Sequence, residues 1–410
     1  MADFLKLRND FPMLCNHIQM QGKPLVWLDN ASTTLKPQCV IDAETKYYTE
    51  STSNSHRGDY DLAYQADQTI LKTRQAVASL IHCDPNEVVL TTGATQSLNL
   101  VARGYAEKFL QTGDEILLTL AEHASNILPW YEVCKRTGAV VRFIPLDEKG
   151  RLLPENLEKV ISEKTKIVSV AHVTNVLGYR CDAKALAKIA HGHGAILVLD
   201  GAQSVPHIPT DVKDLDVDFL AFSGHKMCGP TGIGVLYGKY DLLKQMDPLC
   251  VGGGMNVGFD EHGDASYFLP PSGLEAGTLP IASIYGFLRA VTYLQSIGME
   301  NIEAREQQLK AYARSKMEGL EGVTFYNLDS DAGLVAFNID GVFAQDFASY
   351  CNYRGIAVRS GEHCAKLLDR VLKTKATVRA SFYFYTTEEE IDALIEAMKQ
   401  GGNFLDAYFS

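Results

Sequence analysis

Short apolar runs alternate with helix-length segments through the first two thirds of the chain, and this alternation limits the possible folds more than any other feature. The apolar runs are EVVLTT, EILLTL, VVRFIP, KIVSVAHV, AILVLD, DFLAFS and GIGVLYG. Segments with the length of helices stand between several of them, such as ATQSLNLVARGYAEKFL, LPWYEVCKRTG and AKALAKIAHGHG. Runs rich in Val, Ile, Leu and Phe with helices between them predict βαβ units around a mainly parallel sheet that is buried on both faces. The expected fold class is therefore α/β.

The last third of the chain has a different pattern. A long charged helical segment, NIEAREQQLKAYARSKMEGLEG, is followed by strand-like GLVAFNI and GIAVRSG and by a late helix, TEEEIDALIEAMKQ. This order is typical of a smaller α+β domain, and a chain of 410 residues is long enough for two domains. We expect a large domain over residues 17–290 and a small domain formed by residues 1–16 and 291–410.

Composition excludes several classes of function. The chain has 38 Lys and Arg against 50 Asp and Glu, a net charge of -12, which argues against a nucleic-acid partner. The sequence shows neither the start of a secretory signal nor an apolar stretch of ~18 residues, so we expect a cytoplasmic protein without a membrane partner. Nine scattered cysteines without a C-x-x-C pair indicate neither a disulfide framework nor a structural zinc site, and we expect no metal.

Chemically active residues follow three of the predicted strands. AILVLD ends in Asp200, DFLAFS is followed by His225 and Lys226, and VVLTT runs into the turn GATQS, which opens a helix. Because the carboxyl ends of parallel strands meet at one edge of a sheet, these side chains are expected to lie together, where ligands of such sheets bind. The edge would offer an acid, a lysine and the N-terminus of a helix.

Pyridoxal phosphate is a cofactor that would use all three groups. The free N–H groups at the helix start, Gly93, Ala94 and Thr95, can hold its phosphate, and the side chains of Ser223 and His225 can add donors. Asp200 can keep the pyridine nitrogen protonated, and Lys226 can form a Schiff base with the aldehyde. Each feature alone is common, since a strand-end Asp is often a cap and a loop lysine is usually solvated. No G-x-x-x-x-G-K-[ST] motif competes for the phosphate.

A set of motifs spread over nearly the whole chain resembles the pyridoxal-phosphate cysteine desulfurases of the class V aminotransferase group. The motifs are WLDNASTT, TTGATQSLN, AEHASNILPW, VTNVLGY, VLDGAQSVPH, FSGHKMCGPTGIGVLYG, LEAGT and RSGEHCA. The resemblance is strongest to the group II, or Suf-type, branch. It implies a fold-type I transferase with a mainly parallel seven-stranded sheet in the large domain and a smaller α+β domain that carries the catalytic cysteine loop.

The resemblance also implies roles for residues around the cofactor. It makes Lys226 the Schiff-base lysine, Asp200 the partner of the pyridine nitrogen and His123 the imidazole stacked on the ring. Asn175 and Gln203 would face the ring hydroxyl and its surroundings. The phosphate ligands would be Thr95, Ser223 and His225, with Thr278 reaching in from a second subunit, so that the active enzyme would be a homodimer.

The implied reaction converts L-cysteine to L-alanine and leaves a persulfide on Cys364, which an acceptor protein would receive for iron-sulfur cluster assembly. Arg379 would clamp the substrate carboxylate, because a planar guanidinium binds carboxylates bidentately. Arg359 lies beside the cysteine loop, and His56 matches a position near the active site. Both are expected to bind substrate.

Three positions depart from the family pattern, and two alternatives stay open. Glu362 replaces a common His beside the nucleophile, Lys366-Leu367 replaces a stiffer continuation of that loop, and EAGTLP replaces EAGTPN. A selenocysteine lyase, or another pyridoxal-phosphate β-lyase, would use the same residues. A noncatalytic protein that only binds the cofactor would be expected to lack one of the chemical residues, and all of them are present.

Overall fold

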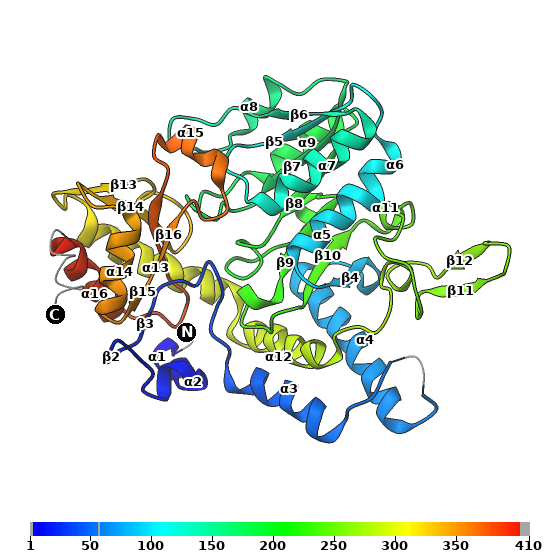
Figure 1. The fold of residues 1–410 in the computed structure, drawn as a ribbon, viewed down its shortest axis with the longest axis horizontal. Helices are drawn as coiled ribbons and strands as arrows, with labels where there is room; N and C mark the ends of the chain where they lie inside the picture. The colour runs from blue at the N-terminus through cyan, green and yellow to red at the C-terminus, as the bar shows by residue number, and fades with distance from the viewer. Residues whose placement is uncertain (1–2, 56–57, 402–410) are drawn as a thin grey trace.

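Figure 1 shows the chain as two adjoining bodies, one built on a seven-stranded sheet and the other on a four-stranded sheet. The computed structural model describes residues 3–55 and 58–401. Among these residues, no helix combines the length and the apolar character that crossing a membrane requires.

The larger sheet confirms the predicted α/β class. Its strand order is β4-β10-β9-β8-β7-β5-β6, and β10 runs antiparallel to both of its neighbours while the pairs from β9 to β6 are parallel. Each apolar run of the sequence forms one strand, so the sheet is mainly parallel as expected. The strands are β4 (Val88–Thr91), β5 (Glu115–Leu118), β6 (Val140–Phe143), β7 (Thr165–Ala171), β8 (Ile196–Asp200), β9 (Phe219–Ser223) and β10 (Gly234–Gly238).

Helices cover both faces of this sheet. Successive strand residues point to opposite faces, so Leu197 and Leu199 pack in one hydrophobic cluster and Val198 in another. Helices α4, α9 and α12 contribute to the first cluster, and α5 and α7 to the second. The helices of this body are α3 (Gln38–Glu50), α4 (Asp61–Ile81), α5 (Ala94–Leu100), a π-helical turn η3 (Val101–Ala106), α6 (Glu107–Phe109), α7 (Leu128–Thr137), α8 (Pro154–Glu158), α9 (Ala183–Gly192), α10 (Val212–Leu215), α11 (Tyr240–Leu243) and α12 (Ile281–Ile297).

The second body holds an antiparallel sheet with the order β13-β14-β17-β16. Its helices pack on the sheet around the buried side chains of Phe337, Phe347 and Leu394. The elements are α13 (Met299–Met317), β13 (Val323–Phe325), β14 (Leu334–Ile339), α14 (Ala344–Tyr353), β16 (Arg359–Gly361), α15 (Asp369–Leu372), β17 (Thr377–Ser381) and α16 (Glu388–Lys399).

The predicted strand GIAVRSG is two strands in the structure. Its first part, β15 (Ile356–Ala357), pairs in parallel with β3 (Val26–Trp27), whereas its second part, β16, pairs with β17. The split matters for function, because β3 leads into the turn 29–32 and β16 leads into the cysteine loop. The segment 26–32 therefore lies beside β15 and β16, which lead into the loop that carries Cys364.

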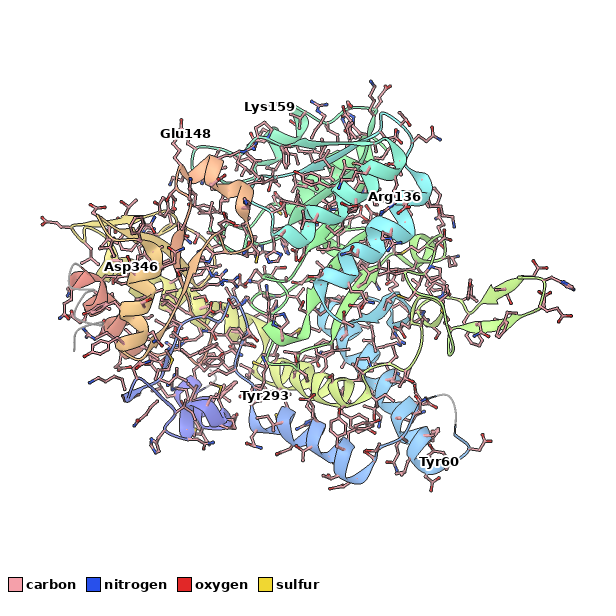
Figure 2. The ribbon with its side chains drawn as sticks, viewed as in Figure 1. Tyr60, Arg136, Glu148, Lys159, Tyr293 and Asp346 are labelled. Carbon is pink, nitrogen blue, oxygen red and sulfur yellow. The ribbon has the colours of Figure 1, made fainter. Side chains whose placement is uncertain are left out.

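The N-terminal segment joins the two bodies. Helices α1 (Phe4–Leu7) and α2 (Pro12–Cys15) lie near the small hairpin β1 (Gln19–Met20) and β2 (Lys23–Pro24). Tyr293 of α12 donates a hydrogen bond to Asp10 at 2.8 Å, and Figure 2 shows Tyr293 at this junction. The Phe11 ring packs against the ring of Tyr385 in a tilted arrangement, with ring centroids 4.5 Å apart. The expected domain boundary at residue 290 falls inside α12, and the division into two domains stays a prediction.

Candidate active site

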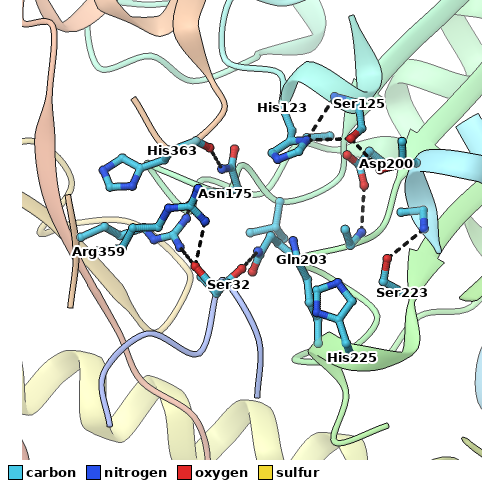
Figure 3. Close-up of a pocket in the computed structure, with 18 residues that line it drawn as sticks. Ser32, His123, Ser125, Asn175, Asp200, Gln203, Ser223, His225, Arg359 and His363 are labelled. Atoms are coloured by element: carbon cyan, nitrogen blue, oxygen red, sulfur yellow. Dashed lines mark hydrogen bonds between the residues drawn. The ribbon is translucent and has the colours of Figure 1, made fainter. Parts of the chain in front are cut away.

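A cavity of about 240 Å³ lies where the carboxyl ends of the sheet strands face the second body (Figure 3). The loops after β4, β5, β7, β8 and β9 form one wall. The second body contributes Arg359, His363 and Arg379 from the other side. The cavity therefore lies at the sheet edge where the sequence predicted a ligand.

The start of α5 forms one end of the cavity through Ala94 and Thr95. Gly93 caps this helix with a φ of 150°, a backbone conformation that favours glycine. Strand β10 leaves no room for a side chain here, because a Cβ on Gly234 would lie 2.4 Å from the Gly93 Cα. The N–H of Ala94 donates to the Ser223 hydroxyl at 2.8 Å, and the Thr95 and Ser125 hydroxyls are 2.8 Å apart. The start of α5 and the hydroxyls of Thr95, Ser125 and Ser223 thus line one part of the cavity, and a helix N-terminus with hydroxyl donors suits an anion.

Asp200 ends β8 and is buried at the cavity. Burial raises its pKa, while the N–H of Ala202, which donates to the carboxylate at 3.0 Å, and the charge of Lys226 oppose the rise. A protonated ring nitrogen beside this carboxylate would supply the missing positive charge.

Lys226 lies on the short helical turn after β9 and lines the cavity. Desolvation lowers its pKa to about 8, against the partial opposition of Asp200. In the part of the chain that the structure describes, its Nζ makes no hydrogen bond or ion pair. An amine with a lowered pKa and no partner is suited to covalent chemistry with an aldehyde.

Two histidines beside Lys226 are held neutral. Burial, followed by the charge of Lys226, lowers the pKa of both His123 and His225 to about 4. His123 Nδ1 accepts a hydrogen bond from the Ser125 N–H at 3.1 Å, which fixes the ring at the cavity wall. Neutral imidazoles here can face a ring or a phosphate without adding to the positive charge of the site.

Gln203 and Asn175 line the cavity with one amide group each already bound. Gln203 donates to the Ala31 carbonyl at 2.7 Å, and Asn175 donates to the His363 carbonyl at 2.8 Å. The Asn175 Oδ1 atom is buried and has no hydrogen-bond partner among the described residues. A ligand donor would satisfy it.

Arg379 is almost fully buried at the second body's side of the cavity. Its guanidinium donates to the Asn175 carbonyl at 2.8 Å and to the Asp29 carboxylate at 3.3 Å, while its Nε has no partner among the described residues. Burial lowers the pKa of Arg379 to about 10, and Asp29 opposes this. The unpaired Nε–H can receive an anionic group.

Cys364 is exposed on the loop between β16 and α15, next in the chain to His363, which lines the cavity, but Cys364 itself is not among the lining residues. Its φ is 57°, and its carbonyl accepts a hydrogen bond from the Ala124 N–H at 2.7 Å, next to His123. The Arg359 Nη2 atom lies 3.6 Å from the Cys364 sulfur. The nucleophile of the expected reaction and a cationic side chain of the cavity are thus in contact.

Besides Cys364, two predicted site residues are not seen in the cavity lining. Thr278 is exposed and accepts a hydrogen bond from Asn54 at 3.3 Å, but it does not line the cavity of its own chain. His56 lies outside the described residues. Glu362, the residue that departs from the family pattern, lines a separate small hollow on the other side of the cysteine loop.

Among the polar residues that line the cavity, sequence reasoning missed Ser32, Ser125 and His363. The signal for Ser125 and His363 was present, since both lie within motifs that carry another site residue, AEHAS and RSGEHCA. Ser32 lies in NASTT, which indicates only a turn. Its place in the site depends on strands more than 300 residues away.

The residues at the cavity fit pyridoxal phosphate. The helix start and hydroxyls suit a phosphate, Asp200 suits a protonated ring nitrogen, and the unpaired Lys226 amine suits an aldehyde. Within residues 3–55 and 58–401, no cluster of three His, Cys, Asp or Glu side chains could hold a metal ion.

Comparison with known proteins identifies relatives along nearly the whole chain. The family model for aminotransferase class-V matches residues 26–394. A probable cysteine desulfurase of Halalkalibacterium halodurans is 44% identical over 405 residues, which cover 98% of this chain and 99% of that protein. The crystal structure of the cysteine desulfurase CsdA from Escherichia coli is similar with a TM-score of 0.90 and 35% identity over 98% of this chain and 99% of that one. A structure of a C-DES mutant with glycine covalently linked to its pyridoxal-phosphate cofactor has a TM-score of 0.83 and 25% identity over 96% and 98% of the two chains.

Proposed function

This chain belongs to the class-V aminotransferase family and is a pyridoxal-phosphate-dependent cysteine desulfurase, and we propose that it stores the sulfur of L-cysteine as a persulfide on Cys364. The observation that carries this proposal is the exposed Cys364 sulfur, 3.6 Å from the guanidinium of Arg359, which lines the same cavity as Lys226. The persulfide then passes to an acceptor protein that supplies iron-sulfur cluster assembly.

Four groups of this chain would hold the cofactor. The start of α5 with Ser223, Thr95 and His225 would bind the phosphate, and Asp200 would bind the ring nitrogen. His123, Asn175 and Gln203 would contact the ring, and Lys226 would bind the cofactor covalently. When bound, pyridoxal phosphate supplies an electron sink that makes the bonds around the substrate Cα labile.

The substrate is oriented by the second body. Arg379 binds the carboxylate of L-cysteine through its unpaired Nε–H. This leaves the substrate amine toward Lys226 and the substrate sulfur toward the Cys364 side of the cavity. Arg359 keeps a positive charge beside the nucleophile.

Protons and sulfur are then moved by two residues. Lys226, as a neutral amine, takes the proton from Cα, which its lowered pKa of about 8 permits near neutral pH. The Cys364 thiolate attacks the substrate sulfur, the S–Cβ bond breaks, and Cβ gains a proton. In balance, L-cysteine and the Cys364 thiol give L-alanine and the Cys364 persulfide.

The same proposal includes a homodimer. The hairpin of β11 (Asn256–Phe259) and β12 (Ala265–Tyr267) projects from the body in Figure 1. It exposes Phe259 and Val257, and Leu269 follows it, so a second copy is the natural cover for this apolar surface. Thr278 lies further along the chain and is exposed, and in this proposal it reaches the second copy's phosphate site. Light scattering should give twice the chain mass of 45.1 kDa.

We also place the reaction in the cytoplasm. All nine cysteines are free, and a reducing compartment keeps them so. Deleting the gene should lower the activity of the cell's iron-sulfur enzymes, and the wild-type gene should restore it where Cys364→Ala does not. Restoration by Cys364→Ala would contradict the proposed role in sulfur supply.

The purified enzyme tests the reaction itself. With L-cysteine and a reductant it should release alanine and sulfide, and both Lys226→Ala and Cys364→Ala should lose alanine release. Only Lys226→Ala should lose the visible absorbance of the covalently bound cofactor. Pyruvate release in place of alanine would contradict the desulfurase mechanism.

A further inference from the structure

Two arginines at the cavity are forced together by the register of the small sheet. Arg359 in β16 and Arg379 in β17 are directly paired across the antiparallel strands. Side chains in such positions lie on the same face with Cβ atoms roughly 5 Å apart, and like charges there repel. The pKa of Arg379 is lowered first by its burial and further by the charge of Arg359. The pair therefore needs acceptors from outside the sheet.

Ser32 supplies an acceptor to both guanidiniums. Arg359 Nη1 donates to the Ser32 hydroxyl at 2.9 Å, and Arg379 Nη2 donates to the same oxygen at 3.1 Å. The hydroxyl in turn donates to the Asp29 carboxylate at 2.8 Å. Figure 3 shows Ser32 close to Arg359, with dashed lines reaching its hydroxyl.

The hydroxyl of Ser32 is saturated by these contacts. A serine hydroxyl has one hydrogen and two lone pairs. Asp29 can only accept and the guanidiniums can only donate, so the hydrogen goes to Asp29 and both lone pairs go to the arginines. Ser32 therefore has no hydrogen bond left for a substrate, although it lines the cavity.

The remaining N–H groups of the two arginines point to separate tasks. Arg379 keeps an unpaired Nε, and Arg359 places Nη2 3.6 Å from the Cys364 sulfur. We propose that Ser32 is a positioning residue, whose hydroxyl fixes both guanidiniums before the substrate arrives and so gives the site its preference for ligands with an α-carboxylate. This inference rests on the proposed role of Arg379 as the carboxylate ligand.

The turn that carries Ser32 does not depend on its hydroxyl. The Ser32 N–H donates to the Asp29 carbonyl at 3.1 Å, and the Thr33 N–H donates to the same carbonyl at 3.4 Å. Asp29 is also held by a bridge to Ser381 of β17. Ser32→Ala should therefore keep the backbone in place and remove only the hydroxyl, that is, the shared acceptor and its hydrogen bond to Asp29.

Calorimetry on the cofactor-loaded enzyme tests the proposal with two ligands that differ by one carboxylate, L-alanine and ethylamine. Ser32→Ala should raise the Kd of L-alanine roughly tenfold, since hydrogen bonds to charged groups are lost, and should leave the Kd of ethylamine within about twofold. Ser32→Thr, which keeps the hydroxyl, should bind L-alanine like the wild type. Ser360→Ala is the matched control, because its hydroxyl lies next to Arg359 in β16 and makes no hydrogen bond among the described residues.

The outcomes separate the inference from the proposed function. Equal weakening of both ligands in Ser32→Ala would indicate a merely structural role, and no change in either ligand would also overturn the inference. Arg379→Gln provides the reference. If it abolishes the preference for L-alanine over ethylamine and Ser32→Ala does not, only the inference on Ser32 is wrong. If Arg379→Gln keeps the preference, the assignment of Arg379 as the carboxylate ligand is wrong.

Discussion

The amine of Lys226 should be unusually reactive in the cofactor-free enzyme. Desolvation lowers its pKa to about 8, and Asp200 prevents a larger fall. Only the neutral amine attacks an aldehyde. The structure therefore predicts that this lysine reacts near neutral pH, where ordinary lysines are almost fully protonated.

The size of the effect follows from the two pKa values. At pH 7 an amine with a pKa of about 8 is roughly 10% neutral, whereas an ordinary lysine with a pKa of ~10.4 is roughly 0.04% neutral. The neutral fraction of Lys226 should thus exceed that of an ordinary lysine by roughly 200-fold. Its reactivity should rise with pH and level off above about pH 8.

Reductive methylation of the cofactor-free protein measures this directly. Formaldehyde with a mild reductant labels neutral amines, and mass spectrometry of the Lys226 peptide gives the rate at each pH, with free Nα-acetyl-lysine as the reference. In Asp200→Asn the midpoint should move to lower pH, because the carboxylate that raises the pKa of Lys226 is gone. A midpoint near that of the reference, or an upward move in Asp200→Asn, would refute the reasoning.

Three further predictions concern buried contacts. Glu275→Gln should lower the free energy of unfolding by about 3–5 kcal/mol, because the buried Arg74 guanidinium, which lies 2.5 Å from the Glu275 carboxylate, loses its counter-charge. Urea denaturation measures this change, and adding Arg74→Met should recover part of the lost stability rather than double the loss. Arg379→Gln should lower kcat/KM for L-cysteine, measured as alanine release, by roughly 100-fold, because the substrate carboxylate loses charge-assisted hydrogen bonds. A decrease of less than about tenfold would contradict this prediction. His363→Phe should slow persulfide formation roughly tenfold and leave cofactor binding unchanged, because the hydrogen bond from His363 Nε2 to the Thr377 carbonyl, 3.0 Å long, is lost and no longer holds the loop of the nucleophile in place. Unchanged single-turnover rates would argue against this role.

The fold of the larger body was readable from the sequence because its signals are local. Each buried strand appears as a short apolar run, and the helices between them leave a mainly parallel sheet as the arrangement that buries both faces. The strand split at 356–361 was not readable. Ile356 pairs with Val26 and Arg359 with Arg379, and neither partner can be identified from the residues around it.

The same distinction applies to the site. Asp200 and Lys226 follow predicted strands, so their meeting at one edge could be inferred from the chain order alone. Ser32 becomes important only because β16 and β17 place two arginines opposite each other, a long-range consequence of register. The role of Thr278 depends on a second copy of the chain and stays a prediction.

The most direct test of the account is a single turnover of the cofactor-loaded enzyme with L-cysteine and no reductant. We predict one L-alanine per active site and a Cys364 peptide heavier by one sulfur atom, with neither product in Cys364→Ala. Alanine formed by Cys364→Ala at the wild-type rate, or sulfur found on a different cysteine, would contradict the central claim that Cys364 is the nucleophile.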